Sequence, residues 1–159
     1  MEPRILIADD HDIVRHGIRS MIARFRPEWE ICGEVSNGRD AVNAVRTLNP
    51  DVVILDVTMP VMGGLEAAQG IVKLGLPSRI LIFTMHEFDR MGDDVSKAGA
   101  HGYVKKSEAS RDLIAALEAL LSGGTFGLQG QEIAEPGEKG EPNSPSSLRV
   151  FRSQQQEKI

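Results

Sequence analysis

The chain has 159 residues and carries 18 basic against 23 acidic side chains, a formal net charge of −5. This acidic balance argues against a nucleic-acid-binding surface over the whole molecule, and a single cysteine excludes a disulfide framework within the chain. No apolar run approaches the ~20 residues that span a bilayer, and the first ten residues lack the apolar region of a signal peptide. We therefore expect a cytoplasmic protein with no membrane contact.

The N-terminal half of the chain predicts three strands, each followed by a helix. Short apolar runs bounded by acids, glycines or prolines are typical of buried strands, and apolar residues at helical spacing mark the helices. The run VVIL before Asp56 is the clearest strand, because an unbroken apolar run suits burial on both faces of a sheet. We expect strands at 4–8, 29–35 and 52–55, and helices at about 13–25, 41–48 and 65–74.

The C-terminal half predicts two further pairs of strand and helix. Strands are expected at 79–84 and 101–105, with a weaker helix at 88–98 between them because Gly92 lowers helix propensity. Ser110 is predicted to cap the last helix, which runs to Leu121 and ends at the glycine pair 123–124.

Five alternations of strand and helix predict a parallel sheet with helices on both faces. The natural arrangement is a doubly wound, flavodoxin-like α/β fold with strand order 2-1-3-4-5. From Thr125 the apolar residues are scattered, and the segment EPGEKGEPNSPSS is too polar to offset its ordering entropy. We expect one folded domain over residues 1–124 and a disordered tail or linker over residues 125–159.

Polar residues stand where the predicted strands end. Parallel strands bring their carboxyl ends to one edge of the sheet, where ligands bind in such folds. Adjacent carboxylates repel one another unless a cation is bound, and oxygen ligands in an open site suit Mg²⁺. A lysine and a hydroxyl beside that metal could hold phosphoryl oxygens, which predicts phosphoryl transfer onto a carboxylate. These residues are Asp9, Asp10, Asp56, Thr84 and Lys106.

The segment from Met1 to about Leu121 resembles a response-regulator receiver domain. The matching features are the acidic pair after the first strand, Asp56 in DVTMPVMGGLEA, the strand-ending Thr84, and Lys106 in GAHGYVKKS. The stretches IADDHDIVRHGIRSMI and WEICGEVSNGRDAV, and a serine after the lysine, resemble the NarL/LuxR-type branch of that family. In that branch a helix-turn-helix DNA-binding domain usually follows the receiver. We expect none in this chain, and so no DNA binding by the chain itself.

The resemblance implies a role for each matching residue. Asp56 would accept a phosphoryl group from a histidine kinase, and Lys106 and Thr84 would contact the phosphoryl oxygens. Tyr103 matches the aromatic residue that switches with the threonine, and the face from the fourth to the fifth helix would form the output surface and a possible homodimer contact. Mg²⁺ would be held by Asp9, Asp10, Asp56 and the backbone carbonyl of Thr58.

Three points stay open in the sequence. Lys105 is the competing candidate for the active lysine, although the register GYVKK favours Lys106. The Lys106–Ser107 bond would incur ~3 kcal/mol if it were cis. Asp9 or Asp12 could instead cap the first helix, and the four histidines show no metal-ligand spacing.

Other functions compete with that of a signalling receiver that is not an enzyme. One alternative is a stand-alone receiver in a phosphorelay. A second is a phosphatase-type enzyme with an aspartyl-phosphate intermediate, but that family places its acids as DxD after the first strand. A third is a flavin-binding module, but this chain lacks a phosphate-cradling loop because two acids follow the first strand.

Overall fold

Five parallel strands form one sheet in the order β2-β1-β3-β4-β5, which confirms the predicted fold class and strand order. The computed structural model describes residues 2–128, apart from the side chains of residues 88–91. The strands are β1 (Arg4–Ala8), β2 (Glu30–Val35), β3 (Val52–Leu55), β4 (Arg79–Thr84) and β5 (Gly102–Lys105).

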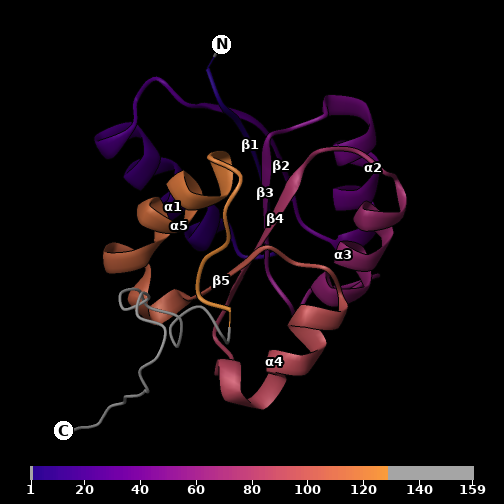
Figure 1. Cartoon of the computed structure of the whole chain (residues 1–159). Helices are drawn as coiled ribbons and strands as arrows, with labels where there is room; N and C mark the ends of the chain where they lie inside the picture. The colour runs from indigo at the N-terminus through magenta and orange to yellow at the C-terminus, as the bar shows by residue number, and fades with distance from the viewer. Residues whose placement is uncertain (1, 129–159) are drawn as a thin grey trace, which may run out of the picture. The chain divides into compact units, whose positions relative to one another are not determined.

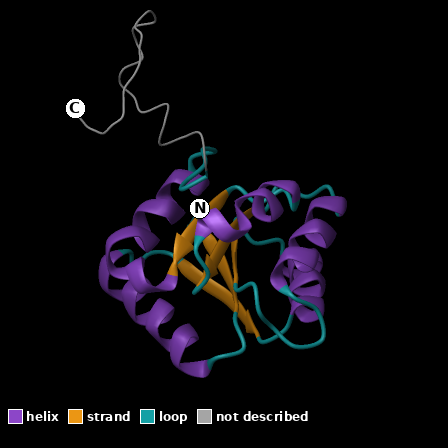
Figure 2. Cartoon of the chain, turned by 90° about the horizontal axis from the view of Figure 1, so that it is seen from below, coloured by secondary structure: helices purple, strands orange, loops and turns teal. Residues whose placement is uncertain are grey.

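Helices cover both faces of the sheet. Helices α1 and α5 lie on one face, and α2, α3 and α4 lie on the other (Figure 1). The view from below shows the strands enclosed between the two helical layers (Figure 2). The helices are α1 (Asp12–Phe25), α2 (Gly38–Leu48), α3 (Gly64–Lys73), α4 (Phe88–Lys97) and α5 (Ala109–Leu121), with a short 3₁₀ turn, η1 (Lys106–Glu108), before the last.

The central strands are buried because helices pack on both of their faces. All four residues of β3 are buried, as its unbroken apolar run predicts. The edge strand β2 is more exposed, and Cys32 lies in it as a half-buried strand residue. No helix in residues 2–128 is long and apolar enough to cross a membrane.

Helix α5 begins differently from the prediction. It starts at Ala109 with Glu108 at the N-cap, so Ser110 lies inside the helix and the predicted Ser110 cap is wrong. The reason is that η1 follows β5 directly and already turns the backbone into helical geometry at Ala109. The bond between Lys106 and Ser107 is trans, since the described residues contain no cis peptide.

The predicted weak helix is present as α4. Its Val95 is buried, as is Ala98 just beyond its end, and Gly99 follows with a φ of +87°, a left-handed backbone that favours glycine. The predicted tail lies outside the described residues from 129 onward, and the compact unit that contains the sheet extends to Phe126. The boundary expected at residue 124 stays a prediction.

Candidate functional site

Three carboxylates meet where the neighbouring strands β1 and β3 end. Asp9 and Asp10 follow β1, and Asp56 follows β3, whose last residue pairs with the last residue of β1. Asp9 is 1% exposed and Asp56 is 4% exposed, whereas Asp10 faces solvent. One ligand atom from each of these acids and from His11 lies within 4.8 Å of all the others. The predicted acidic cluster is therefore formed.

Lys106 points into this cluster. Its Nζ lies 2.7 Å from Oδ2 of Asp9 and 3.4 Å from Oδ2 of Asp56, and its side chain is only 10% exposed. The Nζ of Lys105 instead pairs with Glu87 at 2.8 Å, on a more exposed surface. Of the two candidate lysines, Lys106 is therefore the one placed against the site acids.

The electrostatics of the cluster favour a bound cation. Burial raises the pKa of Asp56, and the neighbouring Asp9 carboxylate raises that pKa further, while Lys106 lowers it. The lysine alone therefore does not offset the cost of ionising Asp56 in this setting. Carboxylate oxygens that converge at a partly open edge match the hard-oxygen ligands of Mg²⁺. The residues present thus fit the metal that the sequence predicts.

Three hydroxyl-bearing residues meet at His86, in the loop between β4 and α4. Thr84 is buried at the end of β4, and its Oγ1 accepts a hydrogen bond from the backbone N–H of His86 at 3.3 Å. The imidazole Nε2 of His86 lies 3.3 Å from Oγ1 of Thr58. Tyr103 is buried, at 7% exposed, and its hydroxyl donates to the carbonyl of His86. His86 thus contacts Thr58, Thr84 and Tyr103, all three of which the sequence predicts to belong to the site.

Glycine at position 64 lets the backbone pack against Asp56. A Cβ there would lie 1.9 Å from the carbonyl oxygen of Asp56, too close for any side chain. The Gly64 N–H donates to the carbonyl of Val57 at 2.8 Å, which fixes the start of α3 under the loop. This contact holds the carboxylate end of β3 in place.

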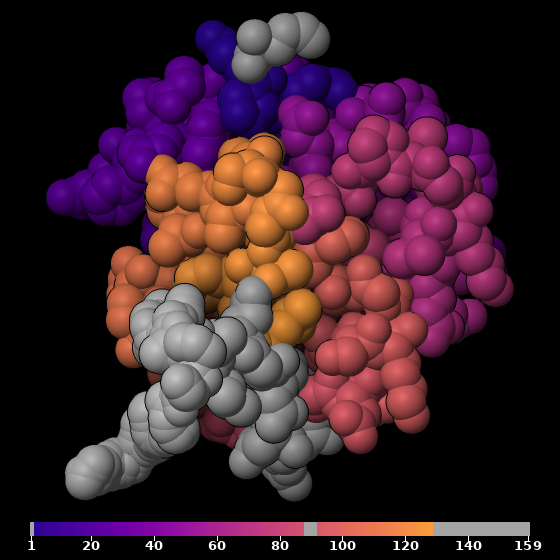
Figure 3. All heavy atoms as spheres, in the orientation of Figure 1, coloured from indigo at the N-terminus to yellow at the C-terminus, as the bar shows by residue number. Residues whose placement is uncertain are grey.

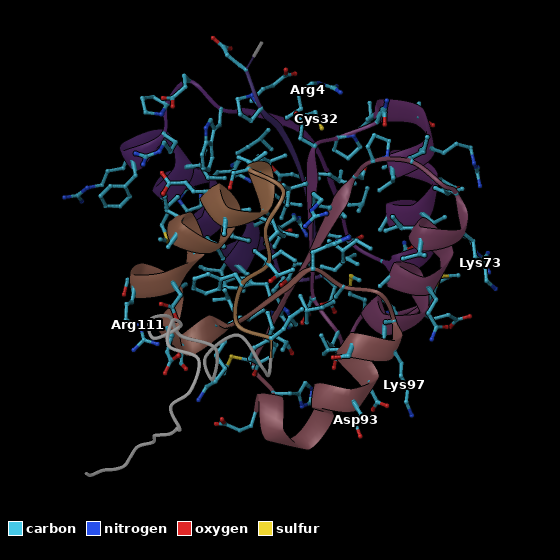
Figure 4. The ribbon with its side chains drawn as sticks, in the orientation of Figure 1. Arg4, Cys32, Lys73, Asp93, Lys97 and Arg111 are labelled. Carbon is cyan, nitrogen blue, oxygen red and sulfur yellow. The ribbon has the colours of Figure 1, made fainter. Side chains whose placement is uncertain are left out.

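The site lies at one end of the sheet. Arg4 and Cys32 lie near the end where β1 and β2 begin, and Arg111, near the start of α5, lies toward the other end (Figure 4). The lone cysteine is therefore not part of the acidic cluster.

Two residues of the site are not singled out by the sequence. The histidines show no metal-ligand spacing in the sequence, yet Nδ1 of His11 lies 3.1 Å from Oδ1 of Asp9 and 3.2 Å from Oδ1 of Asp10. Arg15, one helical turn on, donates from Nη1 to the carbonyl of Asp9 at 2.6 Å. The position of His11 directly after the two acids is a sequence signal for its contact with them, but nothing in the sequence indicates the contact made by Arg15.

Comparisons with known proteins agree with this geometry. A family model described as "Response regulator receiver domain" matches residues 5–118. The chain is 37% identical over 119 residues to the response regulator UvrY of Escherichia coli (strain K12), covering 75% of this chain and 54% of that protein. It is 34% identical to the nitrate/nitrite response regulator protein NarL of Escherichia coli (strain K12), covering 75% of this chain and 55% of NarL.

A solved structure is also similar. It is a two-component response regulator of the LuxR family from Aurantimonas sp. SI85-9A1, with a TM-score of 0.75 and 39% sequence identity, over 81% of this chain and 91% of that one. The chain spans about half the length of the curated relatives it matches.

Proposed function

The chain belongs to the response-regulator receiver family, in its NarL/LuxR-type branch, and on that premise we propose that Asp56 accepts a phosphoryl group from a histidine kinase. The observation that carries the proposal is the placement of the Lys106 ammonium between the buried carboxylates of Asp9 and Asp56. A phosphoryl group on Asp56 would meet that ammonium and the Thr84 hydroxyl.

In this reaction an oxygen of the Asp56 carboxylate attacks phosphorus as the bond from phosphorus to the donor's imidazole nitrogen breaks. The imidazole leaves with the electron pair of that bond and takes a proton from solvent. Lys106 stabilises the charge on the phosphoryl oxygens through its fixed ammonium, and little acid–base chemistry is required of the protein. Catalysis is therefore mainly positioning and charge neutralisation.

Asp9, Asp10, Asp56 and the carbonyl of Thr58 would hold Mg²⁺. When bound, the metal neutralises carboxylate and phosphoryl charge. In its absence the Asp56 carboxylate is disfavoured by burial and by Asp9, so we expect phosphorylation to require the divalent cation.

Thr84 and Tyr103 are proposed to report the phosphorylated state. The hydroxyl of Thr84 would turn from the His86 N–H to a phosphoryl oxygen, and Tyr103, tied to the same loop through His86, would move with it. The change would be read on the α4–β5–α5 face, which we propose as the output and homodimer surface.

The output is proposed to be transcriptional, with this chain acting through protein contacts. A stand-alone receiver in a phosphorelay and an aspartyl-phosphate phosphatase are the alternatives. The division into a receiver over residues 1–124 and a tail over residues 125–159 belongs to the same proposal.

The test uses a small phosphodonor. Incubation with acetyl phosphate and Mg²⁺ should add one phosphoryl group by intact mass spectrometry, and chelation of Mg²⁺ or the change Asp56→Asn should abolish the gain. Lys106→Met should slow the gain on the order of 10²-fold, while Lys105→Met serves as the matched control. A gain that survives Asp56→Asn overturns the proposal, and sustained turnover of a phosphate ester would favour the phosphatase.

A further inference from the structure

After α5 the chain returns to the free edge of the sheet. The backbone N–H of Phe126 donates to the carbonyl of His101 at 3.1 Å, and the N–H of Tyr103 donates to the carbonyl of Phe126 at 2.9 Å. We call residues Thr125 and Phe126 the strap. Figure 1 shows this orange segment running beside β5, which is the edge strand of the sheet. The strap therefore bonds to the backbone on both sides of Gly102.

Several contacts anchor the strap. The side chain of Phe126 is partly buried against the core cluster formed by the sheet, α1 and α5. Arg79, at the start of β4, donates from Nη2 to the carbonyls of Gly123 and Gly124 in the turn before the strap. A Cβ on Gly102 would lie 3.4 Å from the carbonyl oxygen of Phe126 and 2.9 Å from Leu81. The strap is thus held by the packing of Phe126, by the hydrogen bonds of Arg79 to the preceding turn and by close backbone approach to Gly102.

Glycines stand on both sides of the strap. Gly123 has a φ of +90° and Gly127 a φ of +73°, both in the left-handed region, and Gly124 adds further backbone freedom before Thr125. The space-filling view shows the orange atoms of the last described residues exposed on this face (Figure 3). The strap is therefore an ordered segment between two points where the backbone can turn.

Tyr103 also connects the strap to the candidate site. Its N–H bonds to Phe126, and its hydroxyl bonds to the carbonyl of His86. The N–H of His86 bonds in turn to the hydroxyl of Thr84, and its imidazole lies 3.3 Å from the hydroxyl of Thr58. An unbroken series of polar contacts thus runs from the loop after Asp56 to the segment by which the chain leaves the sheet.

We infer that the strap is a release element, which holds the exit of the chain on β5 while Asp56 is unmodified and detaches when Asp56 is phosphorylated. This inference rests on the proposed function. Recruitment of the Thr84 hydroxyl to a phosphoryl oxygen takes away the acceptor of the His86 N–H. The loop then shifts with the carbonyl that holds Tyr103, and the strand segment that binds Phe126 shifts with Tyr103.

A competing explanation is purely structural. Edge strands expose unpaired backbone groups, and proteins often cover them with a loop to prevent unwanted pairing. In that case the strap would protect β5 without any coupling to Thr84 or Asp56. The two explanations differ in whether the strap's hydrogen bonds respond to changes at Tyr103 and at the acidic site.

The first arm of the test needs no phosphoryl analogue. Hydrogen exchange of the Phe126 amide is compared between the full wild-type chain and Tyr103→Phe, which removes the hydroxyl that bonds to His86. The amide of Glu30, bonded to the Pro3 carbonyl at 2.8 Å at the other edge strand, is the reference. Coupling predicts exchange at Phe126 that is faster by about fivefold or more, with Glu30 unchanged. A change below about twofold overturns the inference.

The second arm uses the fact that Tyr103 is the only tyrosine of the chain. Labelling with 3-fluorotyrosine gives a single ¹⁹F resonance, which Phe126→Ala should shift and Phe25→Ala should leave in place. Phe25 is the matched control because it is a half-exposed phenylalanine, 48% exposed, on α1. Equal responses to both changes overturn the inference.

The third arm adds beryllofluoride and Mg²⁺ to the wild-type chain. If beryllofluoride binds at Asp56, Phe126 exchange should rise by about fivefold or more, and unchanged exchange overturns the inference. If no beryllofluoride binds, the proposed function fails. The first two arms then still decide whether the strap is coupled to Tyr103, so the two failures are distinguishable.

Discussion

At the scale of single residues, the site is governed by the balance between one buried ammonium and two buried carboxylates. Lys106 lies within ion-pair distance of Asp9 and Asp56, and all three side chains are almost fully buried. Removing one partner from such a group leaves uncompensated buried charge, which costs far more than breaking an exposed pair. The neighbouring Lys105–Glu87 pair provides the exposed comparison.

We predict that Lys106→Met lowers the free energy of unfolding by about 3 kcal/mol at pH 7.5 without Mg²⁺, because Asp9 and Asp56 lose their counter-ion. Lys105→Met should cost less than ~1 kcal/mol, because its pair with Glu87 is more exposed. Urea unfolding followed by circular dichroism measures both. Equal costs for the two lysines would contradict the assignment of Lys106 to the site.

Asp56 also gives stability a pH dependence. Its pKa is raised in the folded state, so its stabilising contribution is complete below the unfolded value of ~3.9 and is lost as the pH rises through the folded pKa. We predict that Asp56→Asn raises the free energy of unfolding at pH 7.5 on the order of 1 kcal/mol, and that this gain shrinks as the pH falls toward ~4.

The control for this measurement is Asp94→Asn, a change at an exposed position of α4, which should alter stability by less than ~0.5 kcal/mol. Both variants are compared in chelator, since a bound cation would mask the repulsion. A loss of stability in Asp56→Asn at pH 7.5 would show that the fold favours the ionised carboxylate, which contradicts a raised pKa for Asp56.

At the scale of elements, the loop from β3 to α3 is held by close backbone packing. Gly64 starts α3 at a point where the carbonyl of Asp56 leaves no room for a side chain. Gly17 is different, because it lies within α1 and a Cβ there would meet nothing within 4 Å. Alanine substitutions at these two positions therefore distinguish a steric requirement for glycine from the low helix propensity of glycine.

We predict that Gly64→Ala destabilises the fold by about 1–3 kcal/mol, because the backbone must move away from the new Cβ. Gly17→Ala should stabilise it by about 0.5–1 kcal/mol, since alanine is the better residue inside a helix. Thermal and urea unfolding of both variants give the comparison. A neutral Gly64→Ala would mean that the loop after Asp56 can relax without cost.

At the scale of the whole molecule, the unit that contains the sheet runs to Phe126, two residues past the boundary expected from composition. The reason is visible in the backbone, where Phe126 pairs with the start of β5 and its ring packs on the core cluster.

We predict that a chain ending at Leu128 unfolds with the same midpoint as the full chain. A chain ending at Gly124 should lose about 2 kcal/mol, because two backbone hydrogen bonds and the packing of Phe126 are removed. Urea unfolding with matched m-values tests this. Equal stability of the two shortened chains would place the boundary at residue 124, as the composition suggests.

The sequence by itself determined the strand order, the ends of β3 and β4 and the set of acids, because buried parallel strands need unbroken apolar runs and their polar ends must meet at one edge. Only the tertiary structure decided which lysine faces the acids, that His11 and Arg15 contact the acidic pair, and that Phe126 returns to β5. The contacts of His11 and Arg15 depend on side-chain direction, and those of Lys106 and Phe126 join segments far apart in the chain, so neither kind follows from a periodic pattern. The predicted Ser110 cap is wrong because the backbone is already helical at Ala109 after η1, so α5 begins before Ser110.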